Sequence, residues 1–288
     1  MWAIIGGSGF EKFDGFTPVE NLDRETPFGL CSTGLKKVRV GEQECLFLSR
    51  HGEKHELLPS EVNYRANIFA LKAHGAQAIL SFSAVGSLRQ EFKPGDMVVP
   101  SQYLDRTKGL RAHSFCGGGI VGHMSLAHPV CHKAISRLRE LIGGSQDLQS
   151  WDSHFAKTYV CIEGPNFSTQ AESNWYRQMG ADIIGMTNYP EYALAREAGL
   201  TYLPCCFVTD YDCWDDSIPH VTLSEVLEVM RSNNAKAFAL ASQVLALESA
   251  LYGDCDCSEQ GLKNGLMTPE SAWPEASRDW LNVLRGDY

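Results

Sequence analysis

Residues 63–82 read NYRANIFALKAHGAQAILSF, in which a helical pattern runs directly into a strand pattern. Ile68 and Leu71 have the spacing of one helix face and Gly75 is a typical helix stop, so we expect a helix that ends there. The run at 78–82 is short and nearly continuous in apolar residues, as in strands that are buried on both faces. A helix that leads into such a strand predicts an α/β fold.

Short apolar runs of the same kind recur along the chain and are candidate strands. The further runs are Trp2–Ile5, Cys45–Ser49, Thr158–Ile162, Ile183–Met186 and Tyr202–Val208. Residues 223–251 carry apolar side chains at helical spacing and predict a long helix. Apolar strands that alternate with helices indicate a mostly parallel sheet covered by helices on both faces.

We expect one domain over residues 1–250, since no repeat, low-complexity segment or linker interrupts this part of the chain. After Gly253 the sequence becomes polar, which marks residues 251–288 as a C-terminal extension. Within it, residues 273–284 have a helical pattern with Pro274 in the first turn, a position that proline favours. The extension is therefore expected to contain a short closing helix.

The composition limits the class of partner. The chain of 288 residues carries a formal net charge of −10 and is 44% hydrophobic, values that suit a soluble globular protein. A nucleic acid partner is not expected, because a phosphate backbone requires a basic protein surface. No apolar run reaches the roughly 18 residues of a membrane span, and residues 1–7 are too short and uncharged for a signal peptide. We therefore expect a cytoplasmic protein without a membrane partner.

The ten cysteines do not form a recognisable metal or disulfide framework. None forms a Cys-x-x-Cys pair, and Cys205-Cys206 lies within an apolar run, so most of them are expected to be reduced core residues and no metal site is predicted. Cys255-Asp256-Cys257 differs because it lies in a polar stretch. That motif is interpreted either as inert or as redox-active and disulfide-forming.

Polar segments follow several candidate strands, which is where ligands bind in open α/β sheets. Five such segments stand at the predicted carboxyl ends, and their shared location indicates a common ligand site. They are Gly6–Gly9, Arg50-His51, Ser83–Ser87, Met186-Thr187 and Thr209–Asp212.

The first two segments have the chemistry of an anion site. The glycines around Ser8 let the backbone approach an anion closely, and Ser8 itself adds a hydroxyl donor. Lys12 takes the place of the last glycine of the dinucleotide motif, and the Gly-Lys-Ser/Thr ending of a P-loop is missing. Arg50 and His51 can hold a dianion through charge-assisted hydrogen bonds. Each segment alone is also compatible with a plain turn or a structural Arg–His pair.

Asp210 and Asp212 form the most informative pair. Residues two apart in an extended segment point to the same side, so both carboxyl groups can face one ligand. A carboxyl group beside an apolar strand can hold a proton and donate it to a leaving group. A metal site needs further ligands, and none stands at a suitable spacing. Two solvated loop carboxylates are an equal alternative when the pair is taken alone.

Taken in order, these segments resemble the methylthioadenosine phosphorylases, a group within the trimeric purine nucleoside phosphorylase family. The resemblance covers about residues 2–250. It rests on the motifs Ile4–Gly9, Arg50–Gly52, Val62–Asn67, Gly86–Arg89, Glu163–Ser168, Gly185–Thr187 and Thr209–Trp214. It implies a single-domain nucleoside phosphorylase-like fold, with a central mixed β-sheet flanked by helices, and a homotrimeric assembly.

The resemblance also implies a role for each matching residue. Phosphate would be bound by Ser8, Arg50, His51, Ser83, the backbone of Ala84, and Thr187. The nucleoside would contact Phe167 and Ser168 at the base, Met186 at the ribose, Leu223, Val226 and Leu227 at the methylthio group, and His123 from a neighbouring subunit. Asp210 would be the catalytic acid at purine N7, and Asp212 would recognise the 6-amino edge.

These roles imply phosphorolysis of 5′-methylthioadenosine to adenine and 5-methylthioribose 1-phosphate, with phosphate as co-substrate and no cofactor. The aspartates favour adenine, because a carboxylate accepts a hydrogen bond from a 6-amino group and repels a 6-carbonyl. A broader purine nucleoside or methylthioinosine phosphorylase is an alternative, as is a nucleoside-binding protein without activity. Asn166 and Gln170 stand where many family members have basic residues, which leaves the strictness for the substrate undecided.

Overall fold

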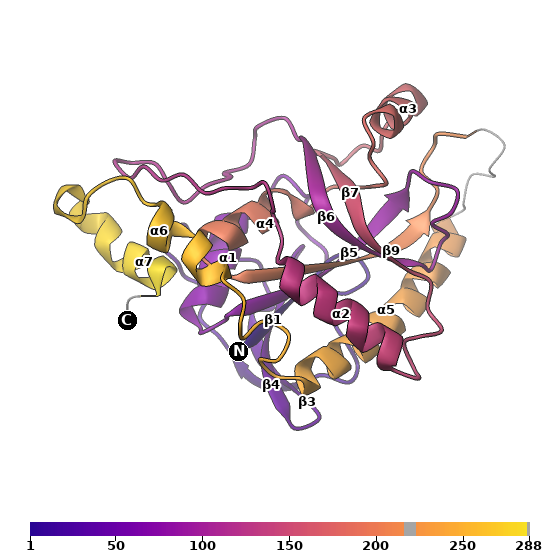
Figure 1. The fold of residues 1–288 in the computed structure, drawn as a ribbon, viewed down its shortest axis with the longest axis horizontal. Coiled ribbons are helices and arrows are strands. Elements are labelled where there is room, and N and C mark those ends of the chain that lie inside the picture. Colours follow the sequence, from indigo (N-terminus) through magenta and orange to yellow (C-terminus); the bar gives the residue numbers. More distant parts are fainter. Residues whose placement is uncertain (216–222, 287–288) are drawn as a thin grey trace.

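A mixed sheet of nine strands forms the centre of the computed structural model, which describes residues 1–215 and 223–286, with the backbone alone for 223–227 (Figure 1). In chain order the strands are β1 (Trp2–Gly6), β2 (Thr17–Asn21), β3 (Lys36–Val40), β4 (Gln43–Ser49), β5 (Ala78–Ser87), β6 (Met97–Arg106), β7 (Ser153–Ile162), β8 (Ile183–Gly185) and β9 (Thr201–Asp210). Their order across the sheet is β2-β3-β4-β1-β5-β8-β7-β6-β9. The expected mixed sheet is thus confirmed.

Helices surround this sheet, as the sequence predicts. They are α1 (Tyr64–Ala73), α2 (His132–Gly144), α3 (Gln170–Gln178), α4 (Asn188–Glu197), α5 (Leu223–Ala246), α6 (Leu262–Gly265) and α7 (Glu275–Arg285), with short 3-10 turns η1 (Cys257–Gln260) and η2 (Glu270–Ala272). α1, α4, α6 and α7 gather at one end of the molecule, whereas α5 packs on β4, β5 and β9 (Figure 1).

The sheet closes on itself on one side. β5 pairs with both β8 and β9, and β9 also pairs with β6, so the strands β5, β8, β7, β6 and β9 form a closed ring. β1, β4, β5 and β9 run parallel to one another, whereas β8 is antiparallel to β5. The prediction of a mostly parallel sheet covered on both faces missed this closure, because nothing in an apolar run states which two strands will pair.

Each apolar run that predicts a strand lies in an observed strand, except that β8 ends at Gly185, one residue before the expected end at Met186. β5 continues to Ser87, past the end expected at Phe82. β2 and β3 gave no such signal: all five residues of β2 are exposed, and β3 mixes lysine and arginine with valine. β6 has no clear strand signal in the sequence, because its apolar start is followed by polar residues in its more exposed half.

The C-terminal extension shares the main core. Trp273, Trp280 and Leu281 are buried in the same apolar cluster as the sheet, and the Trp280 ring meets Phe28 edge-on with centroids 5.3 Å apart. The predicted closing helix is present as α7, which begins after Pro274 and ends at Gly286, with a left-handed φ of 78°. In the part of the chain that the structure describes, no helix has the length and apolar character needed to cross a bilayer.

Candidate active site

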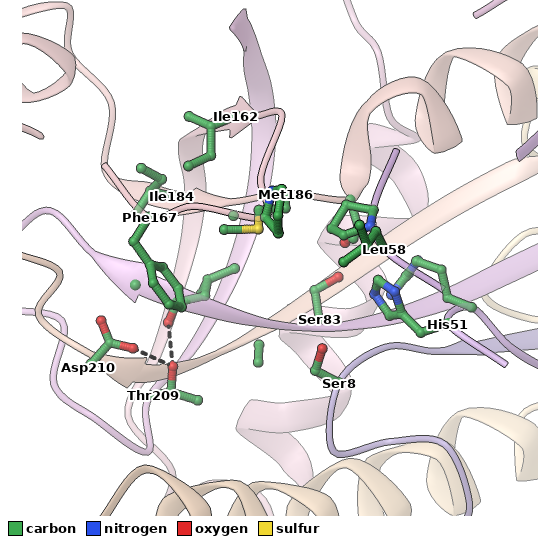
Figure 2. A pocket seen from close by; sticks show the side chains of 18 of the residues that line it. Ser8, His51, Leu58, Ser83, Ile162, Phe167, Ile184, Met186, Thr209 and Asp210 are labelled. Carbon is green, nitrogen blue, oxygen red and sulfur yellow. Dashed lines mark hydrogen bonds between the residues drawn. The ribbon is translucent and has the colours of Figure 1, made fainter. Parts of the chain in front are cut away.

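One cavity of about 710 Å³ gathers residues from all five polar segments that the sequence singled out. Figure 2 shows Ser8, Ser83 and His51 at one end of it, Asp210 and Phe167 at the other. Its volume lies in the range of small-molecule sites, about 300–1,000 Å³. The predicted residues that line it are Ser8, Arg50, His51, Ser83, Ala84, Phe167, Ser168, Met186, Thr187, Asp210 and Asp212.

Three of the five segments lie at the cavity in the way expected, and the other two do not. β1, β4 and β9 do end there, in agreement with the rule for parallel strands. Met186 and Thr187 follow β8, which approaches β5 from the opposite direction and is only three residues long. Ser83 and Ala84 lie inside β5, not beyond its end. The common edge of the parallel strands therefore brings together the segments after β1, β4 and β9, and the closed ring of strands adds the segments of β5 and β8.

The backbone of β5 is open at the cavity. β1 pairs with residues 78–82 of β5, and β8 pairs with Gly86 and Ser87, so neither strand pairs with residues 83–85. β9 pairs with β5 on its other edge along that stretch. Backbone polar groups of Ser83 to Val85 can therefore face the cavity, which agrees with the predicted phosphate contact of the Ala84 backbone.

The hydroxyl end of the cavity combines three side chains from separate elements. Ser8 follows β1, Ser83 lies in β5 and Thr187 precedes α4. Asn188 Nδ2 donates to Ser83 Oγ over 3.0 Å, which fixes that hydroxyl with its proton free to point elsewhere. The Thr187 hydroxyl is not used to cap the helix that follows it. These hydroxyls are the donors that an anion at this end would meet.

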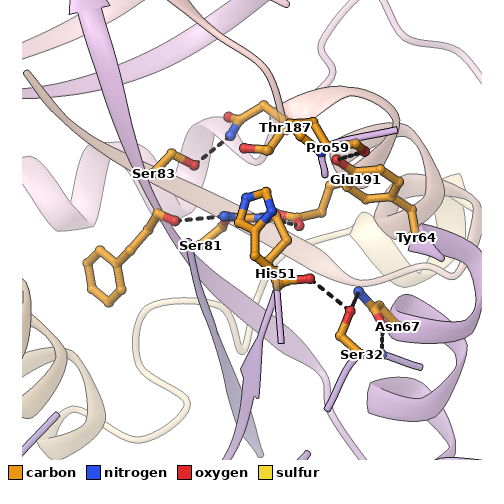
Figure 3. Close-up of polar contacts among 12 residues, drawn as sticks. Ser32, His51, Pro59, Tyr64, Asn67, Ser81, Ser83, Thr187 and Glu191 are labelled. Atoms are coloured by element: carbon orange, nitrogen blue, oxygen red, sulfur yellow. Dashed lines mark hydrogen bonds and ion pairs between the residues drawn. The ribbon is translucent and has the colours of Figure 1, made fainter. Parts of the chain in front are cut away.

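Arg50 is fully buried and belongs to a polar network behind the hydroxyls (Figure 3). Its Nε and Nη2 donate to the two carboxylate oxygens of Glu191 over 2.6 and 2.8 Å. Nη2 also donates to Ser81 Oγ over 2.7 Å and Nη1 to the carbonyl of Phe82 over 3.0 Å. Tyr202 Oη donates to the same carboxylate over 2.7 Å. Four of the five guanidinium N–H groups are thus engaged, and these contacts leave the second Nη1–H unused.

A glycine is required where the chain passes this guanidinium. A Cβ on Gly7 would lie 2.4 Å from Arg50 Nη1 and 2.8 Å from the carbonyl oxygen of Phe82. Gly7 N–H itself donates to that carbonyl over 3.1 Å. The glycine cluster after β1 therefore serves a close approach of two backbone segments and an arginine, with Ser8 held beside them.

His51 is neutral near pH 7. Burial, with the positive charge of Arg50 beside it, lowers the pKa of His51 to about 4. Its Nδ1 lies 2.8 Å from the carbonyl oxygen of Leu57, so the single ring proton is on Nδ1 and Nε2 carries a lone pair. The sequence predicted a phosphate ligand at this position; the ring in this state offers an acceptor, not a second positive charge.

The carboxylate end of the cavity is ordered by hydrogen bonds among neighbours. Asp210 accepts from the Thr209 hydroxyl over 2.7 Å and from the Asp212 N–H over 2.8 Å. Asp212 accepts from the Ser173 hydroxyl over 2.6 Å. Burial raises the pKa of Asp212, and the charge of Asp210 adds to that rise, while the Ser173 hydrogen bond opposes it. Asp212 lies past the end of β9 with a φ of 53°, so a left-handed turn, not strand alternation, brings the two carboxyl groups together.

A second buried arginine, which the sequence did not reveal, ties together the loops after β7 and β8. Arg111 Nε donates to the Glu163 carboxylate over 2.7 Å, and Nη2 donates to the Glu163 carbonyl over 2.8 Å. Nη1 donates to the carbonyls of Met186 and Tyr189, each over 2.7 Å. Glu191, Ser81 and Arg111 were all missed. Ser81 lies within an otherwise apolar strand, which was an available signal, whereas Arg111 lies in an irregular segment that gives none.

Two groups of predicted residues are not placed at the cavity. The side chains of Leu223, Val226 and Leu227 lie outside the described residues, so their predicted contact with the methylthio group stays a prediction. His123 is exposed, and its N–H donates to the carbonyl of Gly265 near α6. It does not line the cavity of its own chain, which is compatible with the expected contribution to a neighbouring subunit.

The sequence profile described as "Phosphorylase superfamily" matches residues 2–246. The chain belongs to this superfamily. The S-methyl-5′-thioadenosine phosphorylase of Geobacter sulfurreducens is 39% identical to it over 285 residues, 99% of this chain and 98% of that protein. The phosphorylase of the same name from Thermosynechococcus vestitus is 41% identical over 285 residues, with the same coverage of 99% and 98%.

Solved structures of phosphorylases have the same fold. A methylthioadenosine phosphorylase from an antarctic soil metagenomic library superposes with a TM-score of 0.87 at 41% identity and covers 98% of each chain. The methylthioadenosine phosphorylase of Schistosoma mansoni in complex with tubercidin gives a TM-score of 0.77 at 38% identity, over 86% of this chain and 91% of that one. The resemblance and the nucleoside phosphorylase-like fold are thus confirmed.

Replacing Glu191 by glutamine should destabilise the protein by about 3–5 kcal/mol, because the Arg50 guanidinium stays buried without its counter-charge. Chemical denaturation followed by circular dichroism measures this change. Glu44→Gln is the matched control, since Glu44 contacts Lys37 and Arg39 at the surface, where such pairs contribute little. Equal denaturation midpoints for Glu191→Gln and the parent would contradict the assigned role of the pair.

His51 should make stability fall as the pH is lowered from 6.5 to about 4. In that range the unfolded chain binds a proton at this residue and the folded chain does not, so acid favours unfolding. His51→Gln should remove up to about 3 kcal/mol of this dependence, measured as the free energy of unfolding against pH.

The neighbouring His55 gives an opposite control for this measurement. Its hydrogen bond to Glu11 raises the pKa of His55 above 6.5, so its contribution is present below that pH and is lost as the pH rises through the folded value. The ring centroids of His51 and His55 are 4.8 Å apart. If His51→Gln and His55→Gln changed the pH dependence of the free energy of unfolding in the same sense, the opposite pKa shifts assigned to the two rings would be wrong.

Proposed function

We propose that the protein cleaves 5′-methylthioadenosine with inorganic phosphate, to give adenine and 5-methylthioribose 1-phosphate. The observation that carries the proposal is one cavity with two chemically different ends. Hydroxyls, an arginine N–H and open strand backbone occupy one end, and two ordered carboxyl groups occupy the other. The first set suits an anion and the second suits the hydrogen-bonding edge of a purine. Full-length relatives at 39% and 41% identity bear the name of this activity.

In the proposed reaction the phosphate itself is the nucleophile. An oxygen of phosphate attacks the anomeric carbon, the glycosidic bond to N9 breaks, and its electron pair passes to the purine. No side-chain nucleophile and no cofactor are required for these two events. The sugar gains positive charge as the bond breaks, and the phosphate stabilises it electrostatically from the adjacent site.

Neutral His51 fits a partly protonated phosphate. Because Nδ1 donates to the Leu57 carbonyl, Nε2 can accept the hydrogen bond of a phosphate O–H group, while Ser8, Ser83 and Thr187 donate to the unprotonated oxygens. The one free N–H of Arg50 supplies the charge-assisted contact. The positive charge that Arg50 brings to the phosphate end is itself balanced by Glu191.

Asp210 is the proposed general acid at the leaving purine. In its protonated form it donates a proton to N7 as the ring gains negative charge, an effect that general acids typically deliver at about 10²–10⁴-fold. Its two oxygens are oriented by the Thr209 hydroxyl and the Asp212 N–H. Asp212, with Ser173 on one oxygen, offers the other oxygen to the 6-amino group. This arrangement prefers adenine to a 6-oxopurine.

The apolar part of the lining favours a methylthio substituent over a hydrated hydroxyl. Leu57, Leu58, Pro59 and Met230 line the same cavity as the hydroxyl end. Such pockets discriminate by about 1–3 kcal/mol per group, so some turnover of adenosine is expected.

A homotrimer that brings His123 of one subunit to the cavity of the next is part of the proposal. Two observations support a covering partner. Phe167 lines the cavity yet is 84% exposed in the single chain, and His123 is exposed on the chain surface. A neighbouring subunit that packs over the cavity would bury both side chains. A cytoplasmic location stays a prediction of the sequence.

Adenine release from 5′-methylthioadenosine should depend on phosphate and should exceed hypoxanthine release from inosine. A spectrophotometric assay with and without phosphate measures both, and Asp210→Asn should lower kcat on methylthioadenosine by about 10²-fold or more. Phosphate-independent turnover would instead establish a hydrolase. Faster cleavage of inosine would establish a broader purine nucleoside phosphorylase, and binding without turnover of either would establish a nucleoside-binding protein.

Asp212→Asn should stabilise the fold while it weakens adenine recognition. Burial raises the pKa of Asp212 above 3.8, so the folded protein bears an unfavourable carboxylate at higher pH that asparagine removes; its Oδ1 still accepts from Ser173. The gain in free energy of unfolding should be larger at pH 7 than at pH 4. The ratio of kcat/KM for methylthioadenosine over methylthioinosine should fall in the same variant. An unchanged ratio would remove Asp212 from base recognition.

A further inference from the structure

Three cysteines from distant parts of the chain converge away from the cavity. Cys131 lies at the start of α2, Cys255 precedes η1 and Cys257 begins η1. The Sγ atoms of Cys131 and Cys255 are 3.2 Å apart, and the three sulfur atoms all lie within 4.8 Å of one another. None of the three lines the cavity. The sequence revealed only the pair at 255 and 257, because the third thiol is more than a hundred positions away.

We propose that this cluster binds one thiophilic d10 metal ion, Zn²⁺ or Cu⁺, through the sulfur atoms of Cys131, Cys255 and Cys257. Zn²⁺ and Cu⁺ prefer thiolate ligands, and Zn–S bonds are about 2.3 Å long. Three sulfur atoms within 4.8 Å of one another require only small movements to surround an ion at that distance. The ion replaces the three thiol protons, so that each cysteine binds as a thiolate and up to three protons are released.

Hydrogen bonds already point at two of the sulfur atoms. Cys131 is the N-cap of α2, and its Sγ accepts from the Ala134 N–H over 3.5 Å. Cys255 Sγ accepts from the Cys257 N–H over 3.2 Å and lies 3.1 Å from Thr201 Oγ1. N–H donors and the N-terminus of a helix favour the thiolate that a metal requires.

Nearby cations offset the charge of the proposed complex. Three thiolates with Zn²⁺ carry a net charge of −1. Lys133 Nζ donates to the Asp254 carbonyl over 3.0 Å, and Arg137 pairs with the Asp254 carboxylate over 2.5 Å, so two basic side chains of α2 stand next to the cysteine segment. These contacts also hold that segment against α2 without the metal.

The segment that carries the cluster is held tightly on its other side as well. A Cβ on Gly199 would lie 3.1 Å from Ser258 Cα, and one on Gly261 would lie 2.7 Å from the carbonyl oxygen of Glu197. Close backbone contacts therefore fix residues 255–261 against the turn between α4 and β9. A metal at the cluster would tie the C-terminal extension to the start of α2, and its effect would be on stability, not on the chemistry of the cavity.

The test is a titration of the chelator-stripped, TCEP-reduced protein with Zn²⁺ against a chromophoric competitor, and with Co²⁺ followed by absorption. We expect one equivalent of Zn²⁺ and a thiolate-to-cobalt charge-transfer band. At free Zn²⁺ of about 100 times Kd, the unfolding equilibrium constant should fall by about 100-fold. Methylthioadenosine turnover should not change with metal loading, which separates this test from that of the proposed function.

Single variants identify the ligands. Cys131→Ser, Cys255→Ser and Cys257→Ser should each weaken Zn²⁺ binding by at least about tenfold and abolish the cobalt band. Serine is a preferred N-cap, so Cys131→Ser keeps the start of α2 intact. Cys116→Ser, a half-buried thiol outside the cluster, is the matched control and should bind as the parent does. Equal Zn²⁺ affinity for Cys131→Ser and the parent would overturn the proposal. A disulfide within the cluster that forms in air at the same rate with and without Zn²⁺ would also overturn it.

Discussion

The salt bridge between Arg50 and Glu191 holds the parts of the site in one place. Its two side chains are 0% and 2% exposed, and their hydrogen bonds reach Ser81 in β5, the backbone at Phe82 and Tyr202 in β9. One ion pair thus connects the end of β4 with α4 and two further strands. A buried pair of this kind is costly to break, because either charge left alone is poorly solvated.

The same pair sets the electrostatics of the cavity. Its positive member lowers the pKa of His51 together with burial, so a ring that looks like a second cation is neutral. Glu191 offsets most of the arginine charge, which leaves one N–H to meet an anion. An anion site built this way relies on oriented hydroxyl and backbone donors more than on net charge. That is compatible with a chain whose formal charge is −10.

The closed ring of strands gives the cavity its two ends. β9 pairs with both β5 and β6, which carries Asp210 toward the strand that bears Ser83, and Met186 and Thr187, which follow the short β8, line the same cavity. Arg111 then fixes the loops after β7 and β8 through four hydrogen bonds to Glu163, Met186 and Tyr189. The carboxylate and hydroxyl ends of the cavity are therefore positioned by one continuous set of strands.

The sequence by itself determined the buried strands, the long C-terminal helices and the polar segments that follow the strands. Those signals are local. An apolar run of five residues predicts a strand whichever strand it pairs with, and Asp210 carries a carboxyl group wherever the fold places it. Resemblance in ordered motifs added the roles of the residues in the two ends. β2 was missed because it is short, polar and exposed, and β3 was missed because only Val38 and Val40 of its five residues are buried, which is too short a pattern to mark a strand.

Only the tertiary structure decided which residues from distant parts of the chain come into contact. Glu191 is 141 positions from Arg50, Arg111 is 52 positions from Glu163, and Cys131 is 124 positions from Cys255. Such pairs form because a buried charge or thiol must find partners in three dimensions, and a single sequence does not record which distant side chain supplies them. The neutrality of His51 and the left-handed turn at Asp212 have the same origin, since both arise from how neighbouring segments pack around them.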